Sequence, residues 1–152
     1  RNDKEASDIL EIANTREDEL FFTLDGVSCK AKIDAYGINE ALKKVTIGDL
    51  KISKDPISKE QAIERVKERD YVRQVRFYEK AILNSSELNE IYENLQEYSV
   101  DRYILFVDPV KVWIIKISDE TAESRDAIIT DGLNRVKNLK EKGICKNQTI
   151  EI

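Results

Sequence analysis

The chain has 152 residues, of which 41% are hydrophobic and 36% are charged, a balance that fits one soluble domain with its own core. Its 25 basic and 30 acidic residues give a net charge of −5, which argues against a protein that coats nucleic acid by charge alone. The chain contains no histidine, which excludes an imidazole base, a histidine metal ligand and a Ser/His/Asp triad from its own residues.

The termini and cysteines give further expectations. We expect residues 1–152 to form a single domain. Because the chain begins at Arg1 and contains no methionine, we expect this domain to lack an N-terminal segment. Two cysteines, Cys29 and Cys145, are too few for a disulfide framework or an iron–sulfur cluster, so we expect a reducing, cytoplasmic location and no such cluster. No apolar run approaches the ~20 residues of a membrane span, and no signal-peptide core follows the charged start, so we expect no membrane partner.

The first third of the chain predicts one helix and three strands. Residues 3–13 have the apolar spacing of a short amphipathic helix. Asp25-Gly26 separates two β-prone runs, 20–24 and 27–34, and is a strong hairpin signal. A polar connection through Gly37 and Asn39 then leads to a third strand over 45–52.

The remainder predicts helices around two more strands. Ser58 and Gln61 have the spacing of a capping box and open a helical stretch that reaches Leu83, with a local break near Arg69-Asp70. A helix over 86–97, strands over 102–107 and 110–117, and a helix over 120–142 that stops at Gly143 follow in order. This order predicts an α/β or α+β fold, with a central mixed sheet flanked by helices.

Two strands carry the candidate chemistry. Alternate strand residues share a face, so Asp49 and Lys51 project together while Leu50 points the opposite way. If the strands over 27–34 and 45–52 are neighbours, Asp34 joins them at one end of the sheet. Charges on apolar strands need a partner, and Mg²⁺ or Mn²⁺ would supply one for the two carboxylates. An ordinary salt-bridged strand end fits the same spacing.

Four segments in this order resemble the PD-(D/E)XK nuclease superfamily, and within it the RecB-like branch with the exodeoxyribonuclease VIII-type phage exonuclease domain. Residues 26–34 resemble the glycine-led strand that ends in the first acid. Residues 47–55 resemble the strand with the second acid and the lysine. Residues 71–78 resemble the helix in which glutamine precedes tyrosine by four positions, and 103–107 with the strand after Pro109 resemble the closing hairpin.

This resemblance implies a restriction-endonuclease-like core and a Mg²⁺- or Mn²⁺-dependent deoxyribonuclease, specifically an exonuclease of phage or prophage recombination. It implies that Asp34, Asp49 and the backbone carbonyl of Leu50 hold the metal and that Lys51 is catalytic. Gln74 and Tyr78 would support the site and the DNA strand, because residues four apart share one helical face. Core packing of Tyr78, with Gln74 bonded to backbone groups, is the alternative. DNA as substrate, a ring-shaped homo-oligomer, a recombination partner protein and a bacterial or phage-infected cell are further implications.

Other candidates are less specific. Glu19, at the entrance to the first strand, is a candidate additional acidic ligand. Five basic residues near the motifs are candidate phosphate contacts or else ordinary solvated surface: Lys30, Lys32, Lys54, Arg73 and Arg76. Many RecB-like relatives carry a histidine on an upstream helix, and its absence here supports an alternative, a catalytically inactive nuclease-like domain that binds nucleic acid or a protein.

Overall fold

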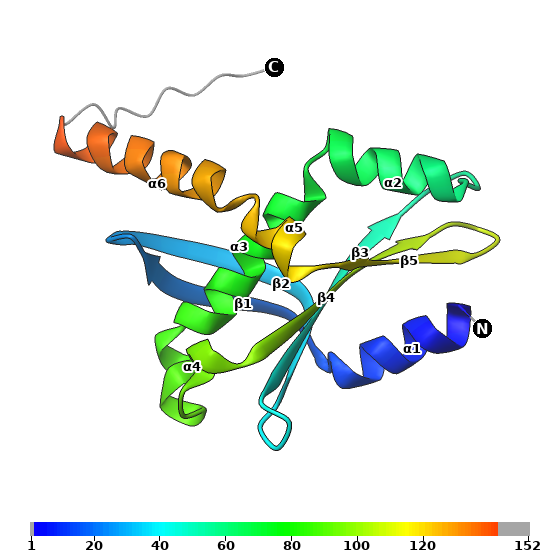
Figure 1. The fold of residues 1–152 in the computed structure, drawn as a ribbon, viewed down its shortest axis with the longest axis horizontal. Coiled ribbons are helices and arrows are strands. Elements are labelled where there is room, and N and C mark those ends of the chain that lie inside the picture. Colours follow the sequence, from blue (N-terminus) through cyan, green and yellow to red (C-terminus); the bar gives the residue numbers. More distant parts are fainter. Residues whose placement is uncertain (1, 143–152) are drawn as a thin grey trace.

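The computed structural model describes residues 2–142, and its centre is a five-stranded mixed sheet (Figure 1). The strands lie in chain order across the sheet: β1 (Thr15–Leu24), β2 (Val27–Asn39), β3 (Lys44–Ile52), β4 (Ser99–Val107) and β5 (Val112–Ile117). The first three pair antiparallel, β4 runs parallel to β3, and β5 pairs antiparallel with β4. The prediction of a mixed sheet flanked by helices in an α+β fold is confirmed.

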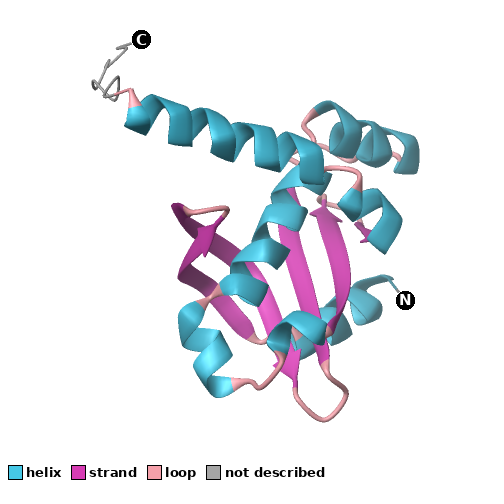
Figure 2. Ribbon diagram, turned by 60° about the vertical axis from the view of Figure 1, so that its left-hand side comes forward, coloured by secondary structure: helices cyan, strands magenta, loops and turns pink. Residues whose placement is uncertain are grey.

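Helices cover the two faces of this sheet unequally. The helix α1 (Asn2–Ile12) precedes the sheet. Four helical segments connect β3 to β4: α2 (Lys59–Glu68), α3 (Tyr71–Asn84), α4 (Ser86–Ile91) and the 3₁₀ helix η1 (Leu95–Glu97). Two helices follow β5, namely α5 (Asp119–Glu123) and α6 (Asp126–Glu141). Figure 2 shows α3 crossing one face of the sheet while α1 lies on the other side.

Strand alternation sorts side chains between these two faces. On β4, Ile104 and Phe106 belong to the main core under α3, whereas Leu105 packs with Ala6 and Ile9 of α1. On β3, Leu50 packs with the α1 cluster, and its neighbours along the strand therefore face α3. The predicted opposition of Leu50 to Asp49 and Lys51 is confirmed.

The predicted hairpin at Asp25-Gly26 is confirmed, and both residues have positive φ, 50° and 79°. The predicted polar connection at Gly37 and Asn39 is wrong, because β2 continues to Asn39 and pairs with β3 over 35–39. Gly37 is required for this path. A Cβ there would lie 2.0 Å from the carbonyl oxygen of Ile12, so only glycine lets the end of α1 approach β2.

We therefore expect Gly37→Ala to destabilise the fold by about 1–3 kcal/mol, because the obstructing atom is backbone and cannot rotate away. Gly132→Ala in α6 is the matched control, since a Cβ there meets nothing within 4 Å. Glycine inside a helix costs roughly 0.5–1 kcal/mol relative to alanine, so the control should be neutral or stabilising. Urea unfolding measures both, and equal stability of the two variants would contradict the close approach at Gly37.

The connection between β3 and β4 follows the predicted capping box. The Ser58 hydroxyl accepts from the backbone N–H of Gln61, and the Gln61 side chain accepts from the backbone N–H of Ser58. The expected break at Arg69-Asp70 is confirmed, with Asp70 in the left-handed region at φ 49°.

Two predicted helices are interrupted. The helix predicted over 86–97 ends at Ile91, because Tyr92 is extended and Asn94 is left-handed, and only a short 3₁₀ turn follows. The helix predicted over 120–142 is divided at Ser124 and Arg125 into α5 and α6. The expected C-cap at Gly143 and the second cysteine, Cys145, lie outside the described residues. Within residues 2–142, no helix combines the length and the apolar character that crossing a bilayer requires.

Candidate functional site

The site forms where the β2–β3 ladder ends. Register pairing between these strands stops at Ala35↔Gly48, and the next residues on each strand are Asp34 and Asp49. At this point the backbone N–H of Leu50 donates to Oδ2 of Asp34 at 2.9 Å, so a side-chain carboxylate replaces a backbone acceptor. The two acidic residues predicted from the sequence are thereby brought together at the end of the ladder.

Asp49 is the most unusual residue of the site. Its side chain is fully buried, and neither carboxylate oxygen has a hydrogen-bond partner among the described residues. Burial raises the pKa of Asp49 from 3.8 to about 7; the Lys51 ammonium opposes this shift and the Asp34 carboxylate adds to it. A buried carboxylate that forms no hydrogen bond and has a single ion pair, from Oδ2 to the Lys51 ammonium, is expensive, and a bound cation would relieve that cost.

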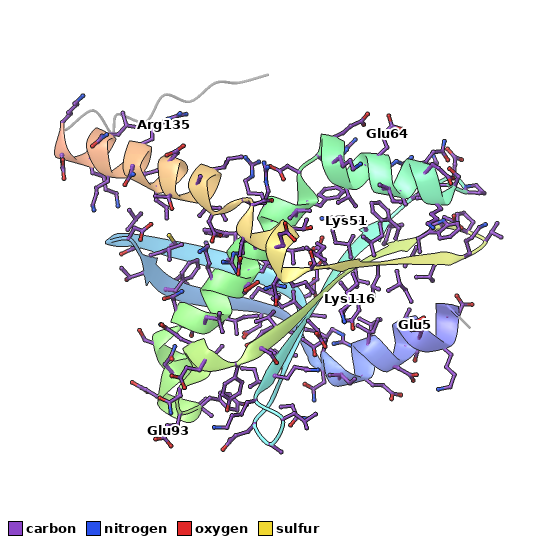
Figure 3. The ribbon with its side chains drawn as sticks, viewed as in Figure 1. Glu5, Lys51, Glu64, Glu93, Lys116 and Arg135 are labelled. Atoms are coloured by element: carbon purple, nitrogen blue, oxygen red, sulfur yellow. The ribbon has the colours of Figure 1, made fainter. Side chains whose placement is uncertain are left out.

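Lys51 lies between this carboxylate and α3. Its Nζ is 3.0 Å from Oδ2 of Asp49, donates to Oε1 of Gln74 at 2.8 Å, and sits 4.2 Å from the ring centroid of Tyr71. Figure 3 shows Lys51 inside the angle between α2, α3 and the sheet, with Glu64 on the outer side of α2. These contacts hold one ammonium at a fixed position beside the two acids.

Gln74 and Tyr78 complete the cluster from α3. Nε2 of Gln74 donates to the Tyr78 hydroxyl at 2.7 Å, so the Gln74 amide joins Tyr78 to Lys51. Burial, and next the charge of Asp49, raises the pKa of Tyr78, which keeps its hydroxyl protonated. Of the alternative, the core packing of Tyr78 is confirmed, since Tyr78 packs against the main core, whereas backbone bonding of Gln74 is wrong, because its side-chain hydrogen bonds go to Lys51 and Tyr78.

The donor set fits a hard divalent cation with few protein ligands. Asp34 and Asp49 provide carboxylate oxygens, and Mg²⁺ commonly uses one or two carboxylates and keeps several waters. No group of three or more His, Cys, Asp or Glu side chains suited to a metal occurs within residues 2–142. The observation that favours a cation is the buried Asp49 carboxylate, which forms no hydrogen bond among the described residues and has Lys51 as its ion-pair partner. The small number of acids leaves positions for water and a phosphate.

Three of the predicted residues lie apart from this cluster. Glu19 pairs with Lys32 in the β1–β2 register, and its carboxylate is 3.8 Å from Nζ of Lys30. All three side chains are exposed. The structure does not bring Glu19 to the two aspartates in a group of three acids; its exposed carboxylate lies beside Lys30 instead.

Arg73 and Lys54 are exposed, and Arg73 lies on α3 next to Gln74 with its Nε 3.7 Å from Asp70. Arg76 is not a free phosphate contact. Its guanidinium binds Asp126 through Nε at 2.7 Å and through a second nitrogen at 2.9 Å.

Sequence reasoning missed the buried charge network that Arg76 joins. Glu79 of α3 accepts from Arg76 and from both Nε and a terminal nitrogen of Arg102, while Arg102 also donates to Asp119 at 2.8 Å. Glu79 and Arg102 are each 3% exposed. The buried Arg-Glu network, defined by these residues and Asp126, fixes α3, the helix of Gln74 and Tyr78, against β4, α5 and α6. The sequence gives no local signal for this pair, because Glu79 stands next to Lys80 and Arg102 next to Asp101, as ordinary surface charges do.

The raised pKa of Asp49 predicts a pH-dependent gain of stability in Asp49→Asn without divalent cations. Below pH 4 both the folded and the unfolded chain hold the proton; between pH 4 and 7 only the folded chain does, so wild-type stability falls as pH rises. The shift corresponds to roughly 4 kcal/mol, part of which is offset in the variant, because its amide is also buried and has few hydrogen-bond partners. We expect Asp49→Asn to be more stable than wild type by about 2 kcal/mol at pH 8, and to lose this advantage at pH 4.

Denaturant unfolding in EDTA measures this difference at both pH values. Asp18→Asn is a matched control, because that carboxylate accepts a hydrogen bond from Tyr36 at 2.6 Å and would lose stability on substitution. An Asp49→Asn variant that is less stable than wild type at pH 8 would show that the carboxylate is satisfied in the metal-free protein.

Comparisons with known proteins bear on the fold. No protein-family model matches the chain, and no curated protein does. The structure superposes on the crystal structure of a candidate exonuclease from Eubacterium rectale with a TM-score of 0.61 and 12% identity, over 98% of this chain and 59% of that one. The chain has a nuclease-like fold.

This nuclease-like fold spans 59% of the length of the Eubacterium rectale protein, and at 12% identity the likeness extends to the fold alone. A second solved structure, SSO0001, matches over 85% of this chain and 57% of that one at 13% identity, with a TM-score of 0.41.

Proposed function

We propose that the chain is a divalent-metal-dependent nuclease that hydrolyses DNA phosphodiester bonds. The observation that carries this proposal is the fully buried carboxylate of Asp49, which lies beside Asp34, forms no hydrogen bond among the described residues and is neutralised only by its 3.0 Å ion pair with Lys51. The nuclease-like fold supports it as well.

Asp34, Asp49 and the carbonyl oxygen of Leu50 would hold Mg²⁺ or Mn²⁺. When bound, such an ion lowers the pKa of a coordinated water and shields the charge of the scissile phosphate. The chain's own residues supply the rest. Lys51, fixed by Asp49 and Gln74, donates hydrogen bonds to a phosphate oxygen or to the attacking water and stabilises the negative charge that develops there.

Gln74 and Tyr78 act through Lys51 and at the edge of the site. Gln74 accepts from the ammonium and donates to the Tyr78 hydroxyl, so the direction of the Lys51 side chain depends on both. The Tyr78 hydroxyl, which accepts from Gln74, keeps its own proton to donate to a phosphate oxygen. No histidine is needed for any of these roles.

We further propose that the nuclease acts from DNA ends, as an exonuclease. It rests on the resemblance of the four motif segments to RecB-like exonucleases and on the description of the Eubacterium rectale protein as a candidate exonuclease. A role in phage recombination, a ring-shaped oligomer and a recombination partner remain predictions from the same resemblance, and a cytoplasmic location remains a prediction from the two cysteines.

A second function is favoured by one observation. Two carboxylates meet at the site, and no third acidic, cysteine or histidine ligand joins them within residues 2–142. A nuclease-like domain that binds nucleic acid or protein without cutting would have the same fold and the same lysine contacts.

Incubation of the chain with linear duplex DNA labelled at one end, in Mg²⁺, in Mn²⁺ or in EDTA, separates the two functions. We expect metal-dependent loss of DNA, with mononucleotides or short products released from the labelled end if the action is exonucleolytic. A covalently closed circle of the same sequence is the control for entry at an end. Intact DNA in Mg²⁺ and Mn²⁺ would overturn the nuclease proposal and favour the binding domain.

A further inference from the structure

The helix α6 carries apolar side chains on two of its sides. Ile129 and Leu133 pack against the β1–β2 hairpin and hold the helix in place. Ile128, Val136 and Leu139 are exposed, at 40%, 40% and 41%, and belong to none of the core clusters within residues 2–142. In Figures 1 and 2, α6 projects as an arm beyond the sheet. Several large apolar side chains on one exposed side of a projecting helix are typical of an interaction surface.

The exposed apolar residues form a single stripe along α6, with Gly132 in its middle. Ile128, Gly132, Val136 and Leu139 follow one another at intervals of four, four and three residues, which places them on one side of a helix. A Cβ at Gly132 would meet nothing within 4 Å, so packing within one chain gives no reason for glycine, which destabilises a helix relative to alanine. The missing side chain lets a second helix approach the backbone of α6 at this point.

A pocket of about 510 Å³ lies beside this α6 stripe. Ile128, Gly132 and Val136 of the stripe contribute to its lining, and so do Tyr71 and Phe77 of α3. When two helices pack, the side chains of one enter the spaces between the side chains of the other. The pocket therefore offers room for apolar side chains of a helix that packs on the stripe.

Two exposed charges beside the α6 stripe indicate which helix fits it. Asp131 and Arg135 lie four residues apart on one side of the stripe, and neither has an ion-pair partner within residues 2–142. If two copies of α6 pack antiparallel about a two-fold axis, Asp131 of each copy faces Arg135 of the other. The same axis brings Ile128 of each copy opposite Leu139 of the other, because both pairs are centred at or next to Leu133. A parallel pair would instead set like charges beside each other, so the stripe is self-complementary in the antiparallel arrangement.

From the apolar stripe, the bare Gly132 and the complementary charges, we propose that α6 is a dimer surface on which α6 of a second copy packs antiparallel. The helix has 16 residues and a length of about 24 Å, so a pair of these helices buries less area than the roughly 1,600 Å² of a typical stable interface. We therefore expect a dimer that dissociates on dilution. A two-fold contact of this kind closes after two copies, so the dimer differs from the ring that the family resemblance implies, and it does not depend on nuclease activity.

Sedimentation velocity of the full chain at increasing protein concentration tests this surface, and wild type should shift from monomer to dimer. Leu139→Glu places a charge in the apolar stripe, and Asp131→Arg sets cations against each other in both charge pairs. Each should raise the dissociation constant of the dimer by about tenfold or more. Asp131→Arg/Arg135→Asp re-forms both pairs and should restore the dimer. Ile91→Glu on α4, which replaces an apolar side chain that is 61% exposed, is the control and should dimerise like wild type.

Cross-linking locates the two-fold axis, in a chain whose Cys29 and Cys145 are replaced by serine. We expect a bismaleimide to join two copies of Gly132→Cys, because this position lies beside the axis. Asn134→Cys, exposed on the opposite side of α6, should give no cross-linked dimer.

Circular dichroism checks that each variant is folded. The proposal is overturned by a wild type that stays monomeric at every concentration, by a dimer that Leu139→Glu leaves unchanged, or by a double charge swap that fails to restore the dimer. Equal cross-linking of Gly132→Cys and Asn134→Cys overturns it as well.

Discussion

Replacing Lys51 with alanine should lower the rate of Mn²⁺-dependent DNA hydrolysis by about 100-fold or more, while the chain stays folded. Removing one preorganised group that stabilises charge in the transition state costs rates of this order. Lys51 is fixed by three partners, so its ammonium needs no rearrangement before it meets a phosphate. Without the ammonium, Asp49 can take up a proton, because its pKa is already raised to about 7.

Lys4→Ala is the matched control for this substitution. Lys4 is an exposed lysine on α1, where its ammonium is 3.2 Å from Asp8. The two variants are compared by initial rates on linear DNA at saturating Mn²⁺ and by thermal unfolding. A Lys51→Ala variant as active as Lys4→Ala would remove Lys51 from the mechanism.

The largest effect on stability is expected from Arg102→Met. This change leaves the buried Glu79 carboxylate with Arg76 as its remaining cationic partner, and breaking one side of a buried ion pair costs about 3–5 kcal/mol. Arg102 also donates to Asp119, so the contact of α5 with β4 weakens at the same time. Urea unfolding of wild type and variant measures the loss.

A double-mutant cycle separates the uncompensated charge from the lost packing. In Arg102→Met/Glu79→Leu neither buried charge remains, and Arg76 keeps its two bonds to Asp126. We expect the double variant to recover at least half of the stability lost in Arg102→Met. Lys4→Met, which breaks an exposed Lys4–Asp8 pair at 3.2 Å, should cost less than about 0.5 kcal/mol. Additive losses in the cycle would contradict the buried Arg-Glu network.

Local signals predicted the parts of the fold that depend on neighbouring residues. Asp25-Gly26 can form a tight turn by itself, and the side chains of Ser58 and Gln61 accept hydrogen bonds from backbone N–H groups at the start of α2. Both features could therefore be predicted from the sequence. The extension of β2 to Asn39 could not be predicted from the sequence. It depends on pairing with β3 and on the approach of Ile12 to Gly37, which are tertiary contacts between distant segments.

The candidate site also has one part that the sequence predicts and another that depends on tertiary contacts. Strand alternation placed Asp49 and Lys51 on one face, and the structure brings Asp34 beside them through the N–H of Leu50. Glu19 had the right charge and a strand position, but its exposed carboxylate lies beside Lys30 and joins no group of three acids among the described residues. The buried Arg-Glu network was missed because its members come from α3, β4, α5 and α6, and no sequence spacing links them.

Calorimetric titration of the metal-free chain with Mn²⁺ at pH 7.5 tests most directly whether Asp34 and Asp49 form a metal centre. We predict saturable binding at a site that Asp49→Asn abolishes, with Asp18→Asn, a carboxylate bonded to Tyr36, as the control that retains it. The affinity should rise from pH 6 to pH 8, because the metal must displace the proton that the raised pKa of Asp49 retains. No saturable binding to wild type, or binding that survives in Asp49→Asn, would contradict the account.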